Sequence, residues 1–382
     1  MTMLPPSYQT HLQSQLNRAE YLLLILLVNV IESIKLVLLE TLATALPLPI
    51  TFNSRRKKIQ RFLSLPQLSF EKIWFPIVQT WLKTEFEPAH VLYIAIDRTN
   101  WGCINLLMIS LIWDKRAYPL YWELLPKQGN SNFEKQTAAI SKVFPVLKDY
   151  KVVLLGDREF CSVKLGNWLT LNQVYFCLRL KQNEFVQIED DIWLQLKALG
   201  LVPGMKLYLN GVSVTKQKGF VKFNVAGKWK GKYWGWSPDE GWFILTNLAS
   251  LDSTVLAYKK RFGIEEMFRD FKRGGYNLEG TNVTGDRLIV LVLLIAIAYT
   301  TATIQGKKIK KMGIQKYIGR VKEVERTQRR HSSFYIGLYG QTWVNFIDEC
   351  AHIVTELMKL SRNKRKYYQK GQRAMELILS AL

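Results

Sequence analysis

The spacing of apolar residues divides the chain into regions of different predicted secondary structure. Leu, Val and Ile recur at helical spacing over residues 16–46, and Pro47 and Pro49 then end the pattern. From Val91 the apolar residues form near-continuous runs, VLYIAID, INLLMISLIW and YPLYWELL, which are typical of buried strands. A turn at residues 114–116 separates the second run from the third, so we expect an antiparallel meander.

The next region alternates helices with strands. Residues 132–147 have helical spacing, KVVLLGD returns to the sheet, and a helix over 163–171 precedes the strand VYFCLRL. The order β-β-β-α-β-α-β predicts an α/β core with a mixed sheet flanked by helices. Short alternating runs separated by Gly, Asn and Pro over residues 184–250 then predict an all-β insertion.

The segment YKKRFGIEEMFRDFK, residues 258–272, is predicted to be one helix, because its apolar residues recur at helical spacing and it contains no proline. Arg261, Glu265 and Lys272 follow Tyr258 by three, seven and fourteen positions. Seven and fourteen residues are close to whole numbers of helical turns, so we expect these four side chains on one face. For this segment alone, an ordinary charged surface helix is the alternative.

After Gly274-Gly275, which is predicted to end that helix, residues 288–304 form a long apolar run. We interpret this run as a buried core helix, because Tyr299 and several threonines lie near its end. A single membrane span is the alternative. The remainder of the chain, from Gly306, is predicted to be helical and is strongly basic.

Charge narrows the class of partner. The 382 residues include 53 Lys and Arg against 31 Asp and Glu, a formal net charge of +22, which favours a polyanionic partner such as nucleic acid or an anionic membrane surface. A basic cluster beside apolar residues in the N-terminal region predicts a DNA contact, with a solvated charge run as the alternative. The cluster consists of Arg55, Arg56, Lys57, Lys58 and Arg61.

Cysteine and histidine spacing excludes several kinds of metal or disulfide site. The four cysteines are widely scattered without a CxxC pair, which argues against a zinc ribbon or a disulfide framework and favours a reducing, cytosolic compartment. The four histidines show no HExxH or similar ligand spacing.

Three carboxylates stand out by position. Asp97 ends the first core strand, Asp157 ends the fourth, and Glu265 lies on the helix after the insertion. A carboxylate at the end of a buried strand is costly unless a cation or hydrogen bonds compensate it. Two aspartates on neighbouring strands with a facing glutamate would form an all-oxygen site suited to Mg²⁺, and two such ions can catalyse phosphoryl transfer. Any one of the three alone could be an ordinary strand-end or surface residue.

These residues also carry a family resemblance. Tyr258-x₂-Arg261-x₃-Glu265-x₆-Lys272 matches the YREK signature of the bacterial insertion-sequence-4-like DDE transposases. IDRTNW around Asp97 and GDREF around Asp157 resemble the first and second acidic motifs of that family, and the likeness spans residues 10–305. It implies an RNase-H-like core interrupted by an all-β insertion, with helical N-terminal and C-terminal regions.

The resemblance also implies roles for single residues. Asp97, Asp157 and Glu265 would form the catalytic, metal-binding triad, while Tyr258, Arg261, Lys272 and Arg158 would contact DNA. Trp242 occupies the place of a tryptophan that stacks on a flipped base during hairpin formation, with a buried strand residue as the equal alternative. Trp234 and Trp236 are rival stacking residues.

The function implied by the resemblance is cut-and-paste DNA transposition. The protein would bind the terminal inverted repeats of its own element and, with two Mg²⁺ ions for which Mn²⁺ is expected to substitute, cut DNA and transfer a strand to target DNA. A homodimer in the DNA complex, no membrane association, and a bacterial cytoplasmic, nucleoid-associated location follow from the same resemblance. A catalytically inactive DNA-binding repressor is the first alternative, and a membrane-surface protein is the second.

The implied organisation has five regions. They are a helical DNA-binding region (1–88), a first part of the core (89–183), a β-rich insertion (184–250), a second part of the core with the catalytic helix (251–305) and a basic helical region (306–382).

Overall fold

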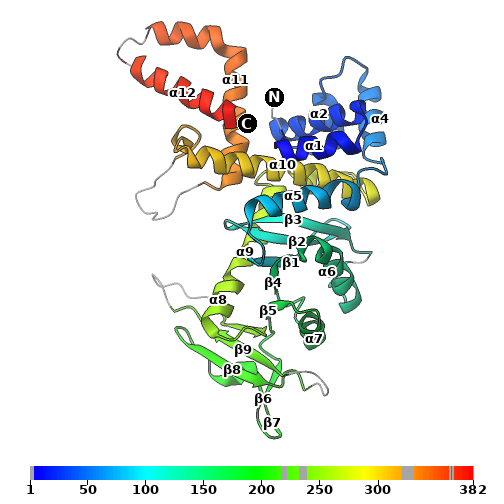
Figure 1. Cartoon of the computed structure of the whole chain (residues 1–382), viewed down its shortest axis with the longest axis vertical. Helices are drawn as coiled ribbons and strands as arrows, with labels where there is room; N and C mark the ends of the chain where they lie inside the picture. The colour runs from blue at the N-terminus through cyan, green and yellow to red at the C-terminus, as the bar shows by residue number, and fades with distance from the viewer. Residues whose placement is uncertain are drawn as a thin grey trace. The chain divides into compact units, whose positions relative to one another are not determined.

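The structure, a computed structural model, describes residues 4–126, 128–216, 222–231, 239–320, 331–360, 363 and 365–381 (Figure 1). Its residues divide into two compact units. The helical unit comprises Met1–Ile77 with Phe271–Leu382, and the sheet unit comprises Val78–Asp270. The five regions predicted from the sequence stay a prediction.

The sheet unit is built on one sheet in which the described residues form eight strands, in the order β3-β2-β1-β4-β5-β10-β9-β8. β4 runs parallel to β1 and to β5, and the other neighbours are antiparallel. The strands are β1 (Val91–Trp101), β2 (Ile104–Trp113), β3 (Arg116–Leu124), β4 (Lys151–Gly156), β5 (Tyr175–Arg179), β8 (Lys206–Val212), β9 (Phe223–Lys228) and β10 (Trp242–Thr246).

The first five strands confirm the predicted meander and the mixed core. Asp114 and Lys115 both have positive φ, at 49° and 65°, and connect β2 to β3 as a two-residue hairpin turn. β2 is buried along almost its whole length because the sheet is covered on both faces. Figure 1 shows α6 (Phe133–Leu147) and α7 (Val163–Leu171) on one face, and α8 (Leu251–Lys260) and α9 (Phe262–Phe271) on the other. This order and direction of strands is that of an RNase-H-like core.

The predicted insertion is rich in strands, but most of them do not form a separate sheet. β6 (Phe185–Glu189) and β7 (Ile192–Gln195) make a two-stranded hairpin, followed by a short 3₁₀ helix, η2 (Leu196–Leu199). β8, β9 and β10 instead extend the core sheet beyond β5, with Ile244 of β10 opposite Arg179. Local apolar patterning predicts strands and leaves open which neighbour they pair with.

The predicted single helix over 258–272 is wrong, because the chain forms two helices that meet at Arg261. There the amide of Arg261 donates to the carbonyl of Tyr258, and the amide of Ile264 donates to that of Arg261, so both bonds span three residues instead of four. A Cβ added at Gly263 would lie 3.1 Å from the backbone oxygen of Arg116. Glycine at this position therefore lets the second helix begin in close contact with β3.

Among the residues that the structure describes, all regular secondary structure of the helical unit is helical. The first part of the chain supplies α1 (Pro6–Gln15), α2 (Arg18–Ile34), α3 (Leu39–Ala45), α4 (Phe52–Phe62) and η1 (Phe70–Trp74), and α5 (Phe75–Glu85) contains the boundary to the sheet unit. The second part supplies η3 (Leu278–Gly280), α10 (Gly285–Lys311), η4 (Gln315–Tyr317), α11 (Ser333–Leu360) and α12 (Arg365–Ala381).

α10 is long and apolar enough to cross a membrane, with a mean hydropathy of 2.2 over its most apolar window, but 89% of that window is buried within the protein. Together α2 and α3 also reach this apolar threshold, with a bend of 104° between them. α2, α11 and α12 pack around α10. Its burial favours the interpretation of α10 as the core helix of this unit.

α10 and α11 cross at two glycines. A Cβ added at Gly306 would lie 1.8 Å from the backbone oxygen of Ser333, and one added at Gly337 would lie 1.8 Å from that of Ala302. Only glycine permits backbones to approach this closely. The two residues therefore fix where the helices meet.

Candidate active site

The two candidate catalytic aspartates lie on neighbouring strands, at the point where the parallel pairing of β1 with β4 ends. The prediction that Asp97 ends the first core strand is wrong, because β1 continues to Trp101 and stays paired with β2 over these residues. Ile96 of β1 is paired with Gly156 of the parallel strand β4, and Asp97 and Asp157 each follow that pair by one residue. The carboxylate of Asp97 is only 14% exposed. Burial, followed by the negative charges of Asp157 and Glu265, raises the pKa of Asp97 to about 7 against the opposing effect of Arg261.

A guanidinium lies among the three candidate acids. Nη1 of Arg261 is 3.2 Å from Oδ2 of Asp97, and Nη2 pairs with Oε1 of Glu265. Burial lowers the pKa of Arg261, but the negative charges around it, including that of Asp157, outweigh burial and raise the pKa overall. The fold therefore brings acids from three separate sequence motifs around one cation.

The donor chemistry of this cluster fits a divalent metal. Three carboxylates against one guanidinium leave an excess of negative charge, and the buried carboxylate of Asp97 is costly in its ionised form. In the conformation described, however, no group of three or more His, Cys, Asp or Glu among the described residues is arranged to hold a metal ion. Arg261 holds Asp97 and Glu265 instead.

The remaining residues of the YREK signature are divided between the two units. Tyr258 is buried in the sheet unit, and burial raises its pKa. Lys272 belongs to the helical unit, where its Nζ lies 2.6 Å from Oε1 of Glu279. Trp242, at the start of β10, is half-buried and packs edge-on against Tyr258, with ring centroids 5.1 Å apart. Trp234 and Trp236 lie outside the described residues.

A bidentate ion pair that sequence reasoning missed connects the two aspartate motifs. Nε of Arg98 donates to both carboxylate oxygens of Glu159 at 3.0 Å, and the amide and hydroxyl of Ser131 donate to the same carboxylate at 3.0 and 3.1 Å. Arg98 follows Asp97 directly, and Glu159 lies two residues after Asp157. The pair therefore holds the end of β4 against β1 and positions both aspartates. Adjacency to the motif aspartates is the signal that could have identified it.

Arg158, predicted to contact DNA, pairs with Glu240. The same carboxylate also accepts from Arg179, at the end of β5, and from Gln182. Sequence reasoning recognised the strand VYFCLRL but singled out neither Arg179 nor Glu240. Arg179 could have been found because, like Asp97 and Asp157, it is a charged residue close to the end of an apolar run.

In the helical unit, the structure separates the predicted basic cluster into two groups. Arg55 donates to the backbone oxygens of Ala43, Leu48 and Ile50, and Nε of Arg56 is 3.0 Å from Oε1 of Glu40. These two arginines join α4 to α3 and to the segment between them. Their side chains therefore support the local fold.

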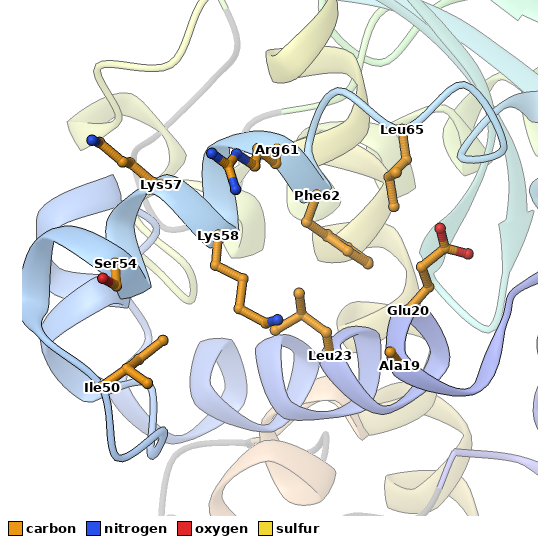
Figure 2. Close-up of a pocket in the computed structure, with 10 residues that line it drawn as sticks. All are labelled: Ala19, Glu20, Leu23, Ile50, Ser54, Lys57, Lys58, Arg61, Phe62 and Leu65. Atoms are coloured by element: carbon orange, nitrogen blue, oxygen red, sulfur yellow. The ribbon is translucent and has the colours of Figure 1, made fainter.

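Lys57, Lys58 and Arg61 line a groove of about 460 Å³ between α4 and the start of α2. Figure 2 shows Phe62 and Lys58 extending from α4 toward the side of α2 that carries Leu23. The remaining lining residues are Ala19, Glu20, Ile50, Ser54 and Leu65. Three cations against the single carboxylate of Glu20 leave the groove with a net positive charge, which suits an anionic partner.

Comparison with known families identifies the class of protein. Residues 104–301, slightly more than half of the chain, match the model of the transposase DDE domain. The chain belongs to this family and is a DNA transposase, as the sequence predicted. The matched range contains Asp157 and Glu265 and begins after Asp97.

Similar solved structures are distant. The piggyBac transposase synaptic complex with hairpin DNA has a TM-score of 0.45 at 11% identity, over 91% of this chain and 78% of that chain. Marinitoga piezophila Argonaute, in complex with 5′-OH guide RNA and target DNA, has a TM-score of 0.24 at 12% identity, over 56% of this chain and 30% of that chain. No curated protein matches the sequence.

Proposed function

We propose that the chain is the transposase of a bacterial insertion sequence in the insertion-sequence-4-like group with the YREK signature. It binds the terminal inverted repeats of its element and catalyses Mg²⁺-dependent cleavage and strand transfer by cut-and-paste, through a hairpin intermediate. The observation that carries the proposal is the convergence of Asp97, Asp157 and Glu265 around Arg261.

In this mechanism Asp97, Asp157 and Glu265 would hold two Mg²⁺ ions, or Mn²⁺ in their place. When bound, such ions would activate the attacking oxygen and stabilise the leaving oxygen. With Asp97 and Glu265 as metal ligands, Arg261 would be free of its two ion pairs, and its fork of N–H donors would suit a phosphate of the cut strand. The Arg98–Glu159 pair keeps the two aspartates in register during this exchange.

DNA is held at further points of the chain. Tyr258, Lys272 and Arg158 contact phosphates near the cut, and Trp242 stacks on an unpaired base. Lys57, Lys58 and Arg61 bind phosphates at the groove beside α4, where their positive charges surround an apolar base. Two protomers act together on the two element ends and the target DNA, in the bacterial cytoplasm at the nucleoid and without a membrane.

The ion pairs of Arg261 favour a second candidate, a catalytically inactive, transposase-derived DNA-binding repressor. Both Asp97 and Glu265 are occupied by the guanidinium in the conformation described. If Arg261 remained there, the acids could not serve as metal ligands, and DNA binding alone would be left.

Nicking of DNA that carries the ends of the element distinguishes these functions. We expect the wild type to nick in Mg²⁺, Glu265→Gln to lose nicking while keeping DNA affinity, and the matched variant Glu266→Gln to remain active. Glu266 lies next in sequence but pairs with Arg116 and Arg269. Equal activity of wild type and Glu265→Gln would refute the mechanism. DNA binding without cleavage by the wild type would support the repressor.

A further inference from the structure

The carboxylate of Glu240, in the sheet unit, is surrounded by donors in the way that a protein surrounds an anionic ligand. Oε1 of Glu240 lies 2.6 Å from Nη2 of Arg179 and pairs with Arg158, while Nε2 of Gln182 donates to Oε2 at 3.1 Å. Two guanidinium groups and one amide thus converge on a single side chain. The three donors come from separate points of the chain, the end of β5, the residue after Asp157, and the segment that follows β5.

This cluster lies beside the candidate acids. β4 and β5 are parallel neighbours, with Gly156 paired to Leu178, and Asp157 and Arg179 each follow that pair by one residue. Burial lowers the pKa of Arg179. The nearby positive charges of Arg158 and Arg261 lower it further, and the negative charge of Asp157 opposes them. Across the neighbouring strands β1, β4 and β5, Arg179 is thus the next charged residue after Asp97 and Asp157.

We propose that Arg158, Arg179 and Gln182 form a phosphate site for DNA beside the candidate triad, and that Glu240 occupies this site until DNA displaces it. The inference rests on the proposed function. It adds Arg179 and Gln182 to the DNA-contacting residues and gives Glu240 the role of an internal competitor.

The chemistry of the donors suits a phosphodiester. Two arginines against one carboxylate leave a net positive charge, and the fork of a guanidinium matches the paired oxygens of both carboxylates and phosphates. Nε of Arg158 has no hydrogen-bond partner within the described residues and is buried, so it becomes a donor for an anion only where that anion takes the place of Glu240. Glu240 is 35% exposed, and a carboxylate at such a position can exchange with a ligand from solvent.

Removing the competitor has an effect opposite to that of removing a donor. Glu240→Gln keeps the shape of the side chain but frees both arginines from a negative partner, so DNA affinity rises, by roughly three- to tenfold at low salt. Arg179→Ala removes one phosphate contact, so affinity falls and the slope of log Kd against log [salt] decreases by about 1. If the cluster had only a structural role, Glu240→Gln and Arg179→Ala would both lower the free energy of unfolding, and neither would raise the affinity for DNA.

The test is fluorescence anisotropy with the full chain and a labelled DNA duplex of arbitrary sequence, in EDTA over a series of KCl concentrations. Phosphate contacts do not depend on base sequence, so this duplex is sufficient. Asp252→Asn is the matched control, because it also removes one negative charge, from a side chain that is 82% exposed in the same unit.

We expect Glu240→Gln to bind more tightly than Asp252→Asn, and Arg179→Ala to bind more weakly than the wild type with a reduced salt dependence. If Arg179→Ala does not fold, Arg179→Lys and Gln182→Ala replace it, with weaker binding expected of each. Wild-type binding that Glu240→Gln and the donor variants leave unchanged would overturn this inference alone. Absence of any salt-sensitive DNA binding by the wild type would instead overturn the proposed function.

Discussion

Asp270, near the end of α9, places a buried negative charge where the helix meets the start of β3. Its side chain is 8% exposed, and Oδ2 lies 3.2 Å from Nε of Arg116, yet neither atom makes a hydrogen bond of good geometry with the described residues. Burial raises the pKa of Asp270 from 3.8 to about 7, with Arg116 opposing the shift incompletely. We predict that Asp270→Asn stabilises the protein in neutral and alkaline solution.

The sign and size follow from proton linkage. An acid with a raised pKa binds its proton more tightly in the folded state, so folding stability falls as the pH rises from 3.8 through 7 and is constant above that range. At 1.36 kcal/mol per pKa unit, the raised pKa lowers the free energy of unfolding by about 2 kcal/mol at pH 5, where Asp270 is still protonated in the folded state, and by about 4 kcal/mol at pH 8, where it is ionised. Asparagine cannot ionise, so the stabilisation by Asp270→Asn is about twice as large at the higher pH.

Urea unfolding of both proteins at pH 5 and pH 8, in EDTA, measures this difference through tryptophan fluorescence. Asp252→Asn makes the same chemical change at an exposed side chain, and we expect its unfolding free energy to stay within about 0.5 kcal/mol of the wild type at both values. A stabilisation by Asp270→Asn that is equal at pH 5 and pH 8 would refute the reasoning. So would a loss of stability at pH 8.

Three further predictions concern the helical unit and the candidate acids. Gly306→Ala should destabilise the chain by about 1–3 kcal/mol in urea unfolding because its Cβ would collide with the carbonyl of Ser333, whereas Gly371→Ala, in α12 with open space around it, should gain up to about 1 kcal/mol. Arg55→Ala should cost about 1–3 kcal/mol through its lost carbonyl contacts, while Lys57→Ala should leave unfolding unchanged and weaken DNA binding in anisotropy. In thermal unfolding, Mn²⁺ at about 100 times its Kd should stabilise the wild type by about 2.7 kcal/mol, and EDTA or Glu265→Gln should abolish this gain.

The sequence was sufficient for the core and for the acids of the candidate site, because both depend on local patterns. Continuous apolar runs identify β1 and β4 as buried strands, and a carboxylate at the end of each run marks the point where their parallel pairing ends, although β1 itself continues to Trp101. The meander could be predicted as well, since β2 and β3 are joined by a two-residue turn. β3 follows β2 closely in the sequence, and the parallel direction of β1 and β4 determines where their apolar runs lie relative to each other.

What could not be predicted depends on contacts between distant residues. The pairing of β10 with β5 joins strands separated by the whole insertion, and nothing in the alternation of β10 distinguishes it from a strand of a separate sheet. The break at Arg261 depends on the approach of Gly263 to Arg116 in β3, which helical periodicity does not contain. Similarly, the basic run of α4 gives no sign that Arg55 turns toward the carbonyls after α3 while Lys58 lines the groove.

The acidic and basic side chains of the candidate site pair with one another. On the proposed function, both kinds of side chain are present because the site has two ligands of opposite charge. A site for divalent cations needs carboxylates, a site for DNA phosphates needs arginines, and the two must be adjacent because the metal acts on a phosphate. In the structure, charges of opposite sign at the site pair with each other, the buried Arg261 with Asp97 and the partly exposed Glu240 with Arg179. On the proposed function, a metal held by the carboxylates would free Arg261 for a phosphate, and DNA bound by the arginines would lower the cost of leaving the acids to the metal. On the proposed function, each ligand therefore increases the affinity of the other, and the coupling is reciprocal.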